Sequence, residues 1–222
     1  MGSPFRTAVN LLFVKQQTIK GRAVSSPQFW EDIYRQKKSP GWDLGRPTPV
    51  FTQWLKENPG RGQSVCVLGA GNGHDAVAFA KRGYVVTAVD FAPAAVQKLQ
   101  RKAKRSKVSM EILGQDMFAL REEKRHSFDL VLEYTTYCAI DPRRRDEYVS
   151  LIVDLLKPEG RLIALFFPMD QDPAIGPPFG VRYPEVRERF GHHFHFAREE
   201  WPNHSVKTRR FREYFVIMER LA

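Results

Sequence analysis

The sequence predicts an α/β fold, in which a mostly parallel sheet of seven strands carries helices on both faces. Two patterns predict it. From residue 64 onward, short runs rich in β-branched residues alternate with longer segments whose apolar residues recur at helical spacing. A glycine-rich turn, Gly69–Gly73, follows the first run and precedes the first helical segment. A helix that returns the chain to the same end of a sheet makes consecutive strands parallel, so the repeating unit is βαβ.

The individual elements can be placed from these runs. Parallel strands are expected at residues 64–69, 85–90, 110–113, 128–134 and 161–167. Helices are expected at residues 72–82, 93–104 and 143–156, and a shorter one at 184–190 follows a loop rich in proline and glycine. The Lys157–Gly160 run is expected to end the third helix. Two last strand-like runs, 193–197 and 214–218, predict an antiparallel hairpin at the sheet edge.

The chain length favours one domain, because 222 residues with 42% hydrophobic side chains suffice for one full core. We expect residues 29–222 to form this domain, and residues 1–28 to be an N-terminal extension or lid arm. The segment 29–49 has a turn-rich stretch and does not fit a βαβ unit. It is predicted to be a lid over a ligand site.

The amino-terminal segment is basic, and no acidic residue precedes Glu31. Such a start is typical of organelle transit peptides, but we favour an N-terminal helix or arm that covers the domain. The chain has no apolar stretch of roughly 18 residues, the length that spans a bilayer, so no membrane span is predicted. Cys66 and Cys138 lie in or just after strand-like runs, which suits reduced, buried thiols and a cytoplasmic location.

The formal net charge is +10, and basic residues gather at 98–107, 143–145 and 207–212. Such clusters could bind the phosphates of nucleic acid, but solvated charged faces are the commoner explanation. A positive field also attracts small anionic substrates. His193 and His195 would share one face of a strand, but no third ligand is evident, so no metal site is predicted.

The glycine turn predicts a site for a nucleotide-like ligand. Gly69, Gly71 and Gly73 let the backbone approach the ligand, and the following helix start offers free N–H groups. The third glycine of the dinucleotide motif is missing, and His74 and Asp75 stand at the helix start instead. A carboxylate there would repel a pyrophosphate but would tolerate a zwitterion, such as the methionine end of S-adenosylmethionine.

Acidic residues follow the next two strands. Asp90 could accept both hydroxyls of a ribose, and Phe91 beside it could lie against an adenine. Asp116 could accept from the adenine amino group while Met117 packs on the ring. Each acid could instead be a helix cap or turn residue. Their joint placement at successive strand ends favours ligand binding, because open α/β sheets bind ligands there.

Several motifs resemble the thiopurine S-methyltransferase superfamily, and its halide/thiol methyltransferase branch most closely. The resemblance runs from about residue 28 to the carboxyl terminus. It rests on residues 29–31 (F-W-E), 41–49 (G-W-D-L-G-R-P-T-P), 71–75 (G-N-G-H-D), 133–140 (E-Y-T-T-Y-C-A-I) and 176–179 (G-P-P-F). One departure is Ala70, where the family often has cysteine, and this change is conservative.

The resemblance implies a Rossmann-like class I methyltransferase fold with S-adenosylmethionine as cofactor. The residues that it assigns to the cofactor site are Trp30, Tyr34, Trp42, Gly69, Asp90, Asp116, Met117 and Glu133. The aromatic residues suit this role, because aromatic faces attract the sulfonium cation that carries the methyl group. Ordinary core packing is the alternative for the tryptophans.

Tyr134 and Tyr137 follow the fourth strand and are expected to face the methyl group, where they could orient a nucleophile or merely wall the pocket. In thiopurine enzymes an arginine often stands where Tyr134 does, so a small acceptor is favoured over a thiopurine. We expect direct in-line transfer to a thiol, hydrosulfide, halide or related chalcogen, which requires no strong base. The alternatives are O- or N-methylation with Glu133 as base, and a basic nucleic-acid-binding protein on the same fold.

Overall fold

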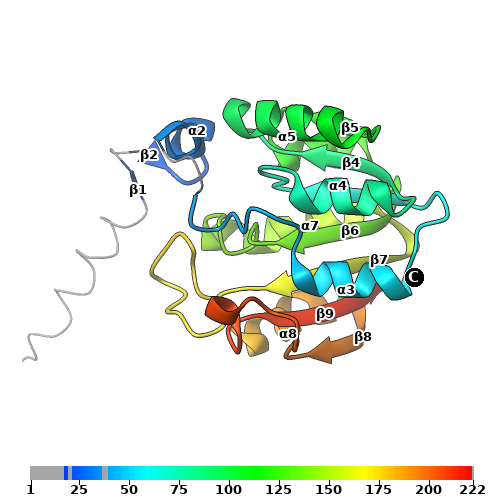
Figure 1. The fold of residues 1–222 in the computed structure, drawn as a ribbon. Helices are drawn as coiled ribbons and strands as arrows, with labels where there is room; N and C mark the ends of the chain where they lie inside the picture. Colours follow the sequence, from blue (N-terminus) through cyan, green and yellow to red (C-terminus); the bar gives the residue numbers. More distant parts are fainter. Residues whose placement is uncertain (1–17, 20–21, 37–39, 222) are drawn as a thin grey trace, which may run out of the picture.

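The computed structural model describes residues 18–19, 22–36 and 40–221, and its centre is a seven-stranded sheet in the order β5-β4-β3-β6-β7-β9-β8 (Figure 1). The strands are β3 (Ser64–Leu68), β4 (Val85–Val89), β5 (Glu111–Leu113), β6 (Phe128–Tyr134), β7 (Leu156–Phe166), β8 (Phe194–Glu200) and β9 (Tyr214–Arg220). Strands β3 to β7 pair in parallel, whereas β9 is antiparallel to both β7 and β8. The predicted fold class is therefore confirmed.

Helices cover both faces of the sheet, because its central strands are apolar on both sides. In β3, Val65 and Val67 belong to one hydrophobic cluster, and Cys66 and Leu68 belong to the other. The first cluster lies under α3 (Pro49–Glu57), α4 (His74–Lys81) and α5 (Pro93–Ser106), which Figure 1 shows in front of the sheet. The second lies under α6 (Leu120–Glu123), α7 (Arg145–Leu155) and α8 (Tyr183–Gly191).

Strand order reverses beside β3, which pairs with β4 on one side and with β6 on the other. Leu68 pairs with Val89 of β4, and Val67 pairs with Leu132 of β6. The carboxyl ends of these three strands therefore lie side by side, and the loops that leave them diverge. Open α/β sheets bind ligands in the crevice that forms at such a point.

Two elements differ from the sequence prediction. The Lys157–Gly160 run was expected to end a helix, but it lies inside β7, where Glu159 has a positive φ of 61°. A register shift between Phe128 and Leu130 of β6 accommodates the extra residues. Helix α3 was not predicted, although Pro49 at its first turn is a typical helix start and its buried residues recur at helical spacing. Short 3₁₀ turns lie at Met117–Ala119, Pro142–Arg144 and Lys207–Arg209.

The amino-terminal part contains strands β1 (Thr18–Ile19) and β2 (Arg22–Ala23) and helix α2 (Pro27–Gln36). Phe29 and Ile33 of α2 form a small cluster with Val24 and Phe179. Most of the predicted extension and the possible transit peptide, residues 1–17 and 20–21, lie outside the described residues, and the domain boundary at residue 29 stays a prediction. None of the helices in the described part of the chain has the length and apolar character that crossing a bilayer requires.

Candidate cofactor and acceptor site

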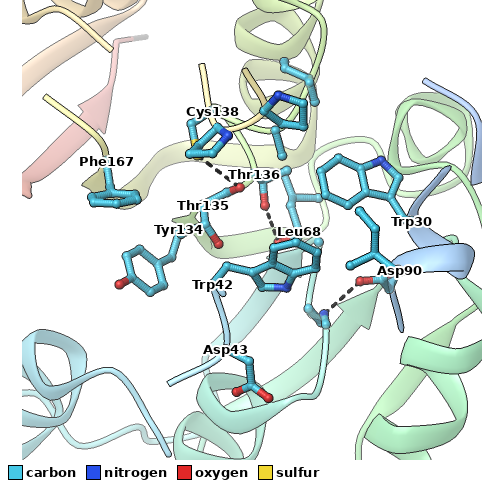
Figure 2. Close-up of a pocket in the computed structure, with 18 of the residues that line it drawn as sticks. Trp30, Trp42, Asp43, Leu68, Asp90, Tyr134, Thr135, Thr136, Cys138 and Phe167 are labelled. Carbon is cyan, nitrogen blue, oxygen red and sulfur yellow. Dashed lines mark hydrogen bonds between the residues drawn. The ribbon is translucent and has the colours of Figure 1, made fainter. Parts of the chain in front are cut away.

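A cavity of about 1070 Å³ lies at the carboxyl ends of the central strands. Its glycine-turn end is lined by residues 69–75, 90–91 and 115–118, which follow β3, β4 and β5. Its tyrosine end is lined by residues 134–136, 138–141, 167, 171, 175–178, 208–209 and 212. Figure 2 shows Asp90 and Trp30 on one side of the cavity and Tyr134 and Phe167 on the other, with Trp42 and Thr136 between them.

The turn after β3 needs glycine for conformation and for space. Gly69 and Gly71 have positive φ values of 57° and 53°, which L side chains rarely adopt. A Cβ atom on Gly69 would lie 2.5 Å from Oγ1 of Thr136, and one on Gly71 would lie 2.9 Å from the Tyr34 hydroxyl. The absence of side chains at Gly69 and Gly71 therefore lets Thr136 and Tyr34 pack directly against the turn.

Asp90 holds the glycine turn in place and still faces the cavity. Its carboxylate accepts from the backbone N–H of Gly71 at 2.8 Å and of Ala92 at 2.9 Å. A carboxylate offers about four acceptor positions, so it can also accept from two hydroxyls of a ligand. Burial raises the pKa of this carboxyl to about 6, despite the opposing backbone hydrogen bonds.

The raised pKa of Asp90 predicts that cofactor binding depends on pH. Protonation removes the negative charge that strengthens the hydrogen bonds, so affinity should be constant above about pH 7 and should fall as pH decreases through about 6. Calorimetric titration with S-adenosylhomocysteine between pH 5 and 8 measures this. Asp90→Asn, as control, should bind weakly and lose this pH dependence. An unchanged pH profile in that variant would contradict the assignment.

The residues after β4 and β5 complete the glycine-turn end. Phe91, Asp116 and Met117 all line the cavity. Asp116 also accepts from the backbone N–H of Phe118 at 3.1 Å and so caps the following 3₁₀ turn. The cap and a ligand contact are compatible, because one carboxylate can accept several hydrogen bonds.

The predicted lid residues lie against the cavity as an aromatic cluster. Trp30, Tyr34 and Trp42 all line it. The ring of Trp42 meets those of Trp30 and Tyr34 edge to face, at centroid distances of 5.5 and 5.7 Å. The indole of Trp30 donates to the carbonyl of Val24 at 2.8 Å, and that of Trp42 donates to the Tyr34 hydroxyl at 3.3 Å. These contacts fix the orientation of the rings.

Two aspartates tie the lid to the glycine turn. Asp43 accepts from the Asn72 amide and lies 3.0 Å from Nε2 of His74. Asp75 accepts from the backbone N–H and the hydroxyl of Thr48, at 2.7 and 2.8 Å. Burial raises the pKa of Asp75 to about 6. From the sequence, Asp75 is expected to act through its charge on the ligand, whereas in the structure it has a hydrogen-bond partner within the protein, Thr48.

Removing the Asp43 carboxylate should loosen the lid. Asp43→Ala deletes the contacts with Asn72 and His74, so we expect cofactor affinity to fall about tenfold, as for one lost charge-assisted hydrogen bond. Hydrogen exchange of residues 40–48 should accelerate. Glu57→Ala, at the exposed end of α3, is the control and should change neither quantity. Unchanged exchange in Asp43→Ala would show that the lid is held by other contacts.

Tyr134 occupies the tyrosine end together with two arginines. Its hydroxyl donates to Oε1 of Glu213 at 2.6 Å and accepts from the Arg209 guanidinium. Arg209 also donates to the carbonyl of Trp42 at 2.9 Å and lies 4.8 Å from the Phe167 ring centroid. The Arg212 guanidinium lies 5.1 Å from the same ring. Each guanidinium is also paired with a carboxylate, since Arg212 donates to Asp170 at 2.7 Å and Arg209 lies 3.8 Å from Glu213, so the two arginines bring N–H donors rather than two unpaired charges to this end.

The structure does not bring Tyr137 and Glu133 to the cavity. Tyr137 is fully buried, packs against Phe166 and donates to Glu185 at 3.0 Å. Glu133 is 1% exposed, and its carboxylate accepts from the backbone N–H groups of Thr136 and Tyr137, at 3.1 and 2.8 Å, and from the Tyr148 hydroxyl. The expectation that Tyr137 faces the methyl group therefore needs correction. Through these backbone hydrogen bonds, Glu133 stabilises the turn after β6 from the core side.

Sequence reasoning missed Arg209, Glu213 and Phe167. Arg209 lies within the basic run 207–212, and Glu213 directly follows it. The sequence suggests a solvated surface there, yet both side chains are buried. Their opposite charges gave little signal, because a spacing of four residues brings side chains together in a helix, whereas Arg209 ends a 3₁₀ turn and Glu213 directly precedes β9. Cys138 lines the cavity, but burial raises the pKa of its thiol, and its Sγ contacts the carbonyl of Thr135 at 3.4 Å.

No group of three histidine, cysteine, aspartate or glutamate side chains in the described ranges is placed to hold a metal ion. His193 and His195, which were considered as ligands, lie at and just before the edge strand β8, away from the cavity lining.

The comparisons with known proteins agree with this geometry. Residues 25–220 match the family model of thiopurine S-methyltransferase. The probable thiol methyltransferase 2 of Arabidopsis thaliana is 34% identical over 161 residues, which cover 72% of this chain and 70% of the relative. Thiocyanate methyltransferase 1 of the same plant is 31% identical over 189 residues, which cover 83% of this chain and 81% of the relative. The 1,6-didemethyltoxoflavin-N1-methyltransferase of Burkholderia thailandensis, solved with S-adenosylhomocysteine, superimposes with a TM-score of 0.60 at 23% identity, covering 99% and 91% of the two chains.

Proposed function

Since the chain belongs to the thiopurine S-methyltransferase family and is an S-adenosylmethionine-dependent methyltransferase, we propose that it methylates a small soft nucleophile. The acceptor would be a thiol, a hydrosulfide, a halide or a related chalcogen species. The observation that carries the proposal is the tyrosine end of the cavity, where Arg209 and Arg212 flank Phe167 and apolar groups such as Ile175 and Pro178 form much of the remaining wall.

The residues at the glycine-turn end fit the cofactor. The turn leaves room where a Cβ atom on Gly71 would meet Tyr34, and Asp90 keeps acceptor positions for the ribose hydroxyls. Met117 and Phe91 offer apolar surface for the adenine, and Asp116 offers an acceptor for its amino group. Trp30 and Trp42 would surround the sulfonium, because aromatic rings attract cations. When bound, S-adenosylmethionine supplies an electrophilic methyl group.

The residues of the chain contribute position and exclusion of water. The lid residues would cover the reacting atoms, and the guanidinium groups of Arg209 and Arg212 would offer N–H donors to an anionic nucleophile at the tyrosine end. Attack of an anion on a sulfonium disperses charge, so a dry, aromatic site favours the step. Holding nucleophile and methyl group in line at contact distance accounts for much of the expected acceleration.

Names of relatives support this acceptor class. Proteins called thiol and thiocyanate methyltransferases are among the relatives at 30% identity or more, whereas the thiopurine S-methyltransferase of Aliivibrio fischeri is 26% identical. The O- or N-methylation alternative relied on Glu133 as base, and that carboxylate is buried away from the cavity. No contact in the described residues favours the nucleic-acid alternative over a small acceptor.

A panel of acceptors with labelled cofactor tests the proposal. It contains iodide, thiocyanate, hydrosulfide, small alkyl thiols, aromatic thiols and a thiopurine, each compared by kcat/KM. We expect the small anions and thiols to exceed the thiopurine. Preference for the thiopurine, or turnover confined to oxygen and nitrogen acceptors, would contradict the proposed acceptor class.

A further inference from the structure

Glu213 is a buried carboxylate directly behind the cavity, and the chemistry above gives it no role. It immediately precedes β9, is 1% exposed, and does not line the cavity. Tyr134 does line the cavity, and its hydroxyl donates to Oε1 of Glu213 at 2.6 Å. A hydrogen bond therefore links a residue that lines the tyrosine end of the cavity to a buried carboxylate.

We propose that Tyr134 and Glu213 form a proton relay that accepts the proton of a protonated acceptor, such as a thiol, during methyl transfer. This rests on the proposed function. As the sulfur attacks the methyl carbon, its proton moves to the Tyr134 oxygen, and the hydroxyl proton of Tyr134 moves to Oε1 of Glu213. The new sulfur–carbon bond forms while the bond to the sulfonium breaks, and the electron pair stays on the departing thioether. After product release, the proton returns through Tyr134 to water in the cavity.

A neutral thiol needs such an acceptor at physiological pH. With a pKa near 8.5, a thiol is only about 3% ionised at pH 7. Other ionisable groups at this end are otherwise engaged: both carboxylate oxygens of Asp141 accept from the Arg143 side chain at 3.0 and 3.1 Å. The Cys138 thiol contacts the carbonyl of Thr135.

The electrostatic surroundings suit a relay rather than a stored phenolate. Burial raises the pKa of Tyr134, so the ionised phenolate is not stable at neutral pH. The hydroxyl would instead accept one proton and donate its own to Glu213 in the same step. Burial also raises the pKa of Glu213 above its ordinary value, although Tyr134, Arg209 and Arg212 oppose this. Arg209 lies 3.8 Å from Oε1 of Glu213 and favours the ionised form of this carboxylate before the step. A carboxylate with a raised pKa takes up a proton more readily than a solvated one.

Acceptors with and without a proton separate this role from a structural one. Thiocyanate is an anion that carries no proton, whereas a small alkyl thiol must lose one. In Tyr134→Phe and Glu213→Gln we expect the ratio of thiol to thiocyanate kcat/KM to fall about tenfold or more at pH 7, up to the roughly 30-fold set by the ionised fraction. The ratio should recover near pH 9.5, where the thiol is already ionised.

Tyr137→Phe is the matched control, because Tyr137 also donates to a carboxylate but does not line the cavity. Its thiol-to-thiocyanate ratio should equal that of the unmodified protein.

A second measurement needs no turnover. Ultraviolet difference absorbance gives the pH at which a bound aromatic thiol ionises, and this pH should rise in Tyr134→Phe.

Three results would overturn the relay. They are unchanged activities with both acceptors in both variants, an equal loss of both activities, which leaves the ratio unchanged and indicates packing alone, and a fall in the ratio that persists at pH 9.5. Thermal unfolding of each variant identifies a folding defect, and Tyr134→Phe tests the path independently if Glu213→Gln is unstable. Absence of turnover with either acceptor in the unmodified protein would contradict the proposed function instead.

Discussion

Asp90→Ala is expected to weaken cofactor binding by about 30-fold to several hundred-fold, which corresponds to about 2–4 kcal/mol. The variant loses the carboxylate that we propose as acceptor for the ribose hydroxyls. It also frees the backbone N–H groups of Gly71 and Ala92, so the glycine turn loses the side chain that holds it. Both effects act on the same end of the cavity and in the same direction.

Isothermal titration with S-adenosylhomocysteine measures this loss. Glu111→Ala is the matched control, because Glu111 begins β5 at the opposite end of the sheet and does not line the cavity. It should leave affinity unchanged. An Asp90→Ala protein that is folded and binds as tightly as the original would exclude Asp90 from the cofactor site.

Arg145→Ala is expected to reduce the free energy of unfolding by about 3–5 kcal/mol, because it leaves a partly buried carboxylate without its main partner. Arg145 is 1% exposed and donates to both oxygens of Glu185, at 2.8 and 2.9 Å, and to the carbonyl of Gly180 at 3.1 Å. Its guanidinium lies 4.5 Å from the centroid of the Tyr137 ring. It thereby joins α7 to α8 and to the loop that borders the tyrosine end.

Thermal unfolding measures this cost, and for a chain of this length the expected fall in Tm is on the order of 10 °C. Arg189→Ala provides the comparison, since Arg189 contacts the same carboxylate at 3.2 Å from a more exposed position. Its cost should stay below about 1 kcal/mol. Similar losses in the two variants would show that burial of Arg145 adds nothing to its ion pair.

The fold and the glycine-turn end could be predicted because they depend on local sequence. The limits of β6, Phe128–Tyr134, coincide with the prediction, since a buried strand between turn residues has a clear pattern. Gly69, Gly71 and Asp90 follow strand ends, and a parallel sheet places all such ends along one edge.

The tyrosine end could not be predicted in the same way, because its geometry depends on a turn and on distant packing. Thr135 adopts a left-handed φ of 60°, and Glu133 then accepts from the two N–H groups that follow. This turn directs Tyr134 to the cavity and Tyr137 to the core, although their spacing alone does not distinguish them. Likewise, the run around Arg209 carries enough charge to suggest a solvated surface, and only the tertiary fold buries Arg209 within it.

Arg209 contacts both parts of the enzyme that must act together. It donates to a lid carbonyl at Trp42 and to the hydroxyl of Tyr134, a residue that lines the tyrosine end of the cavity. A ligand that stabilises the closed lid therefore also preorganises the acceptor end. We expect the two substrates to bind cooperatively, and thermodynamic linkage requires each to raise the affinity for the other by the same factor.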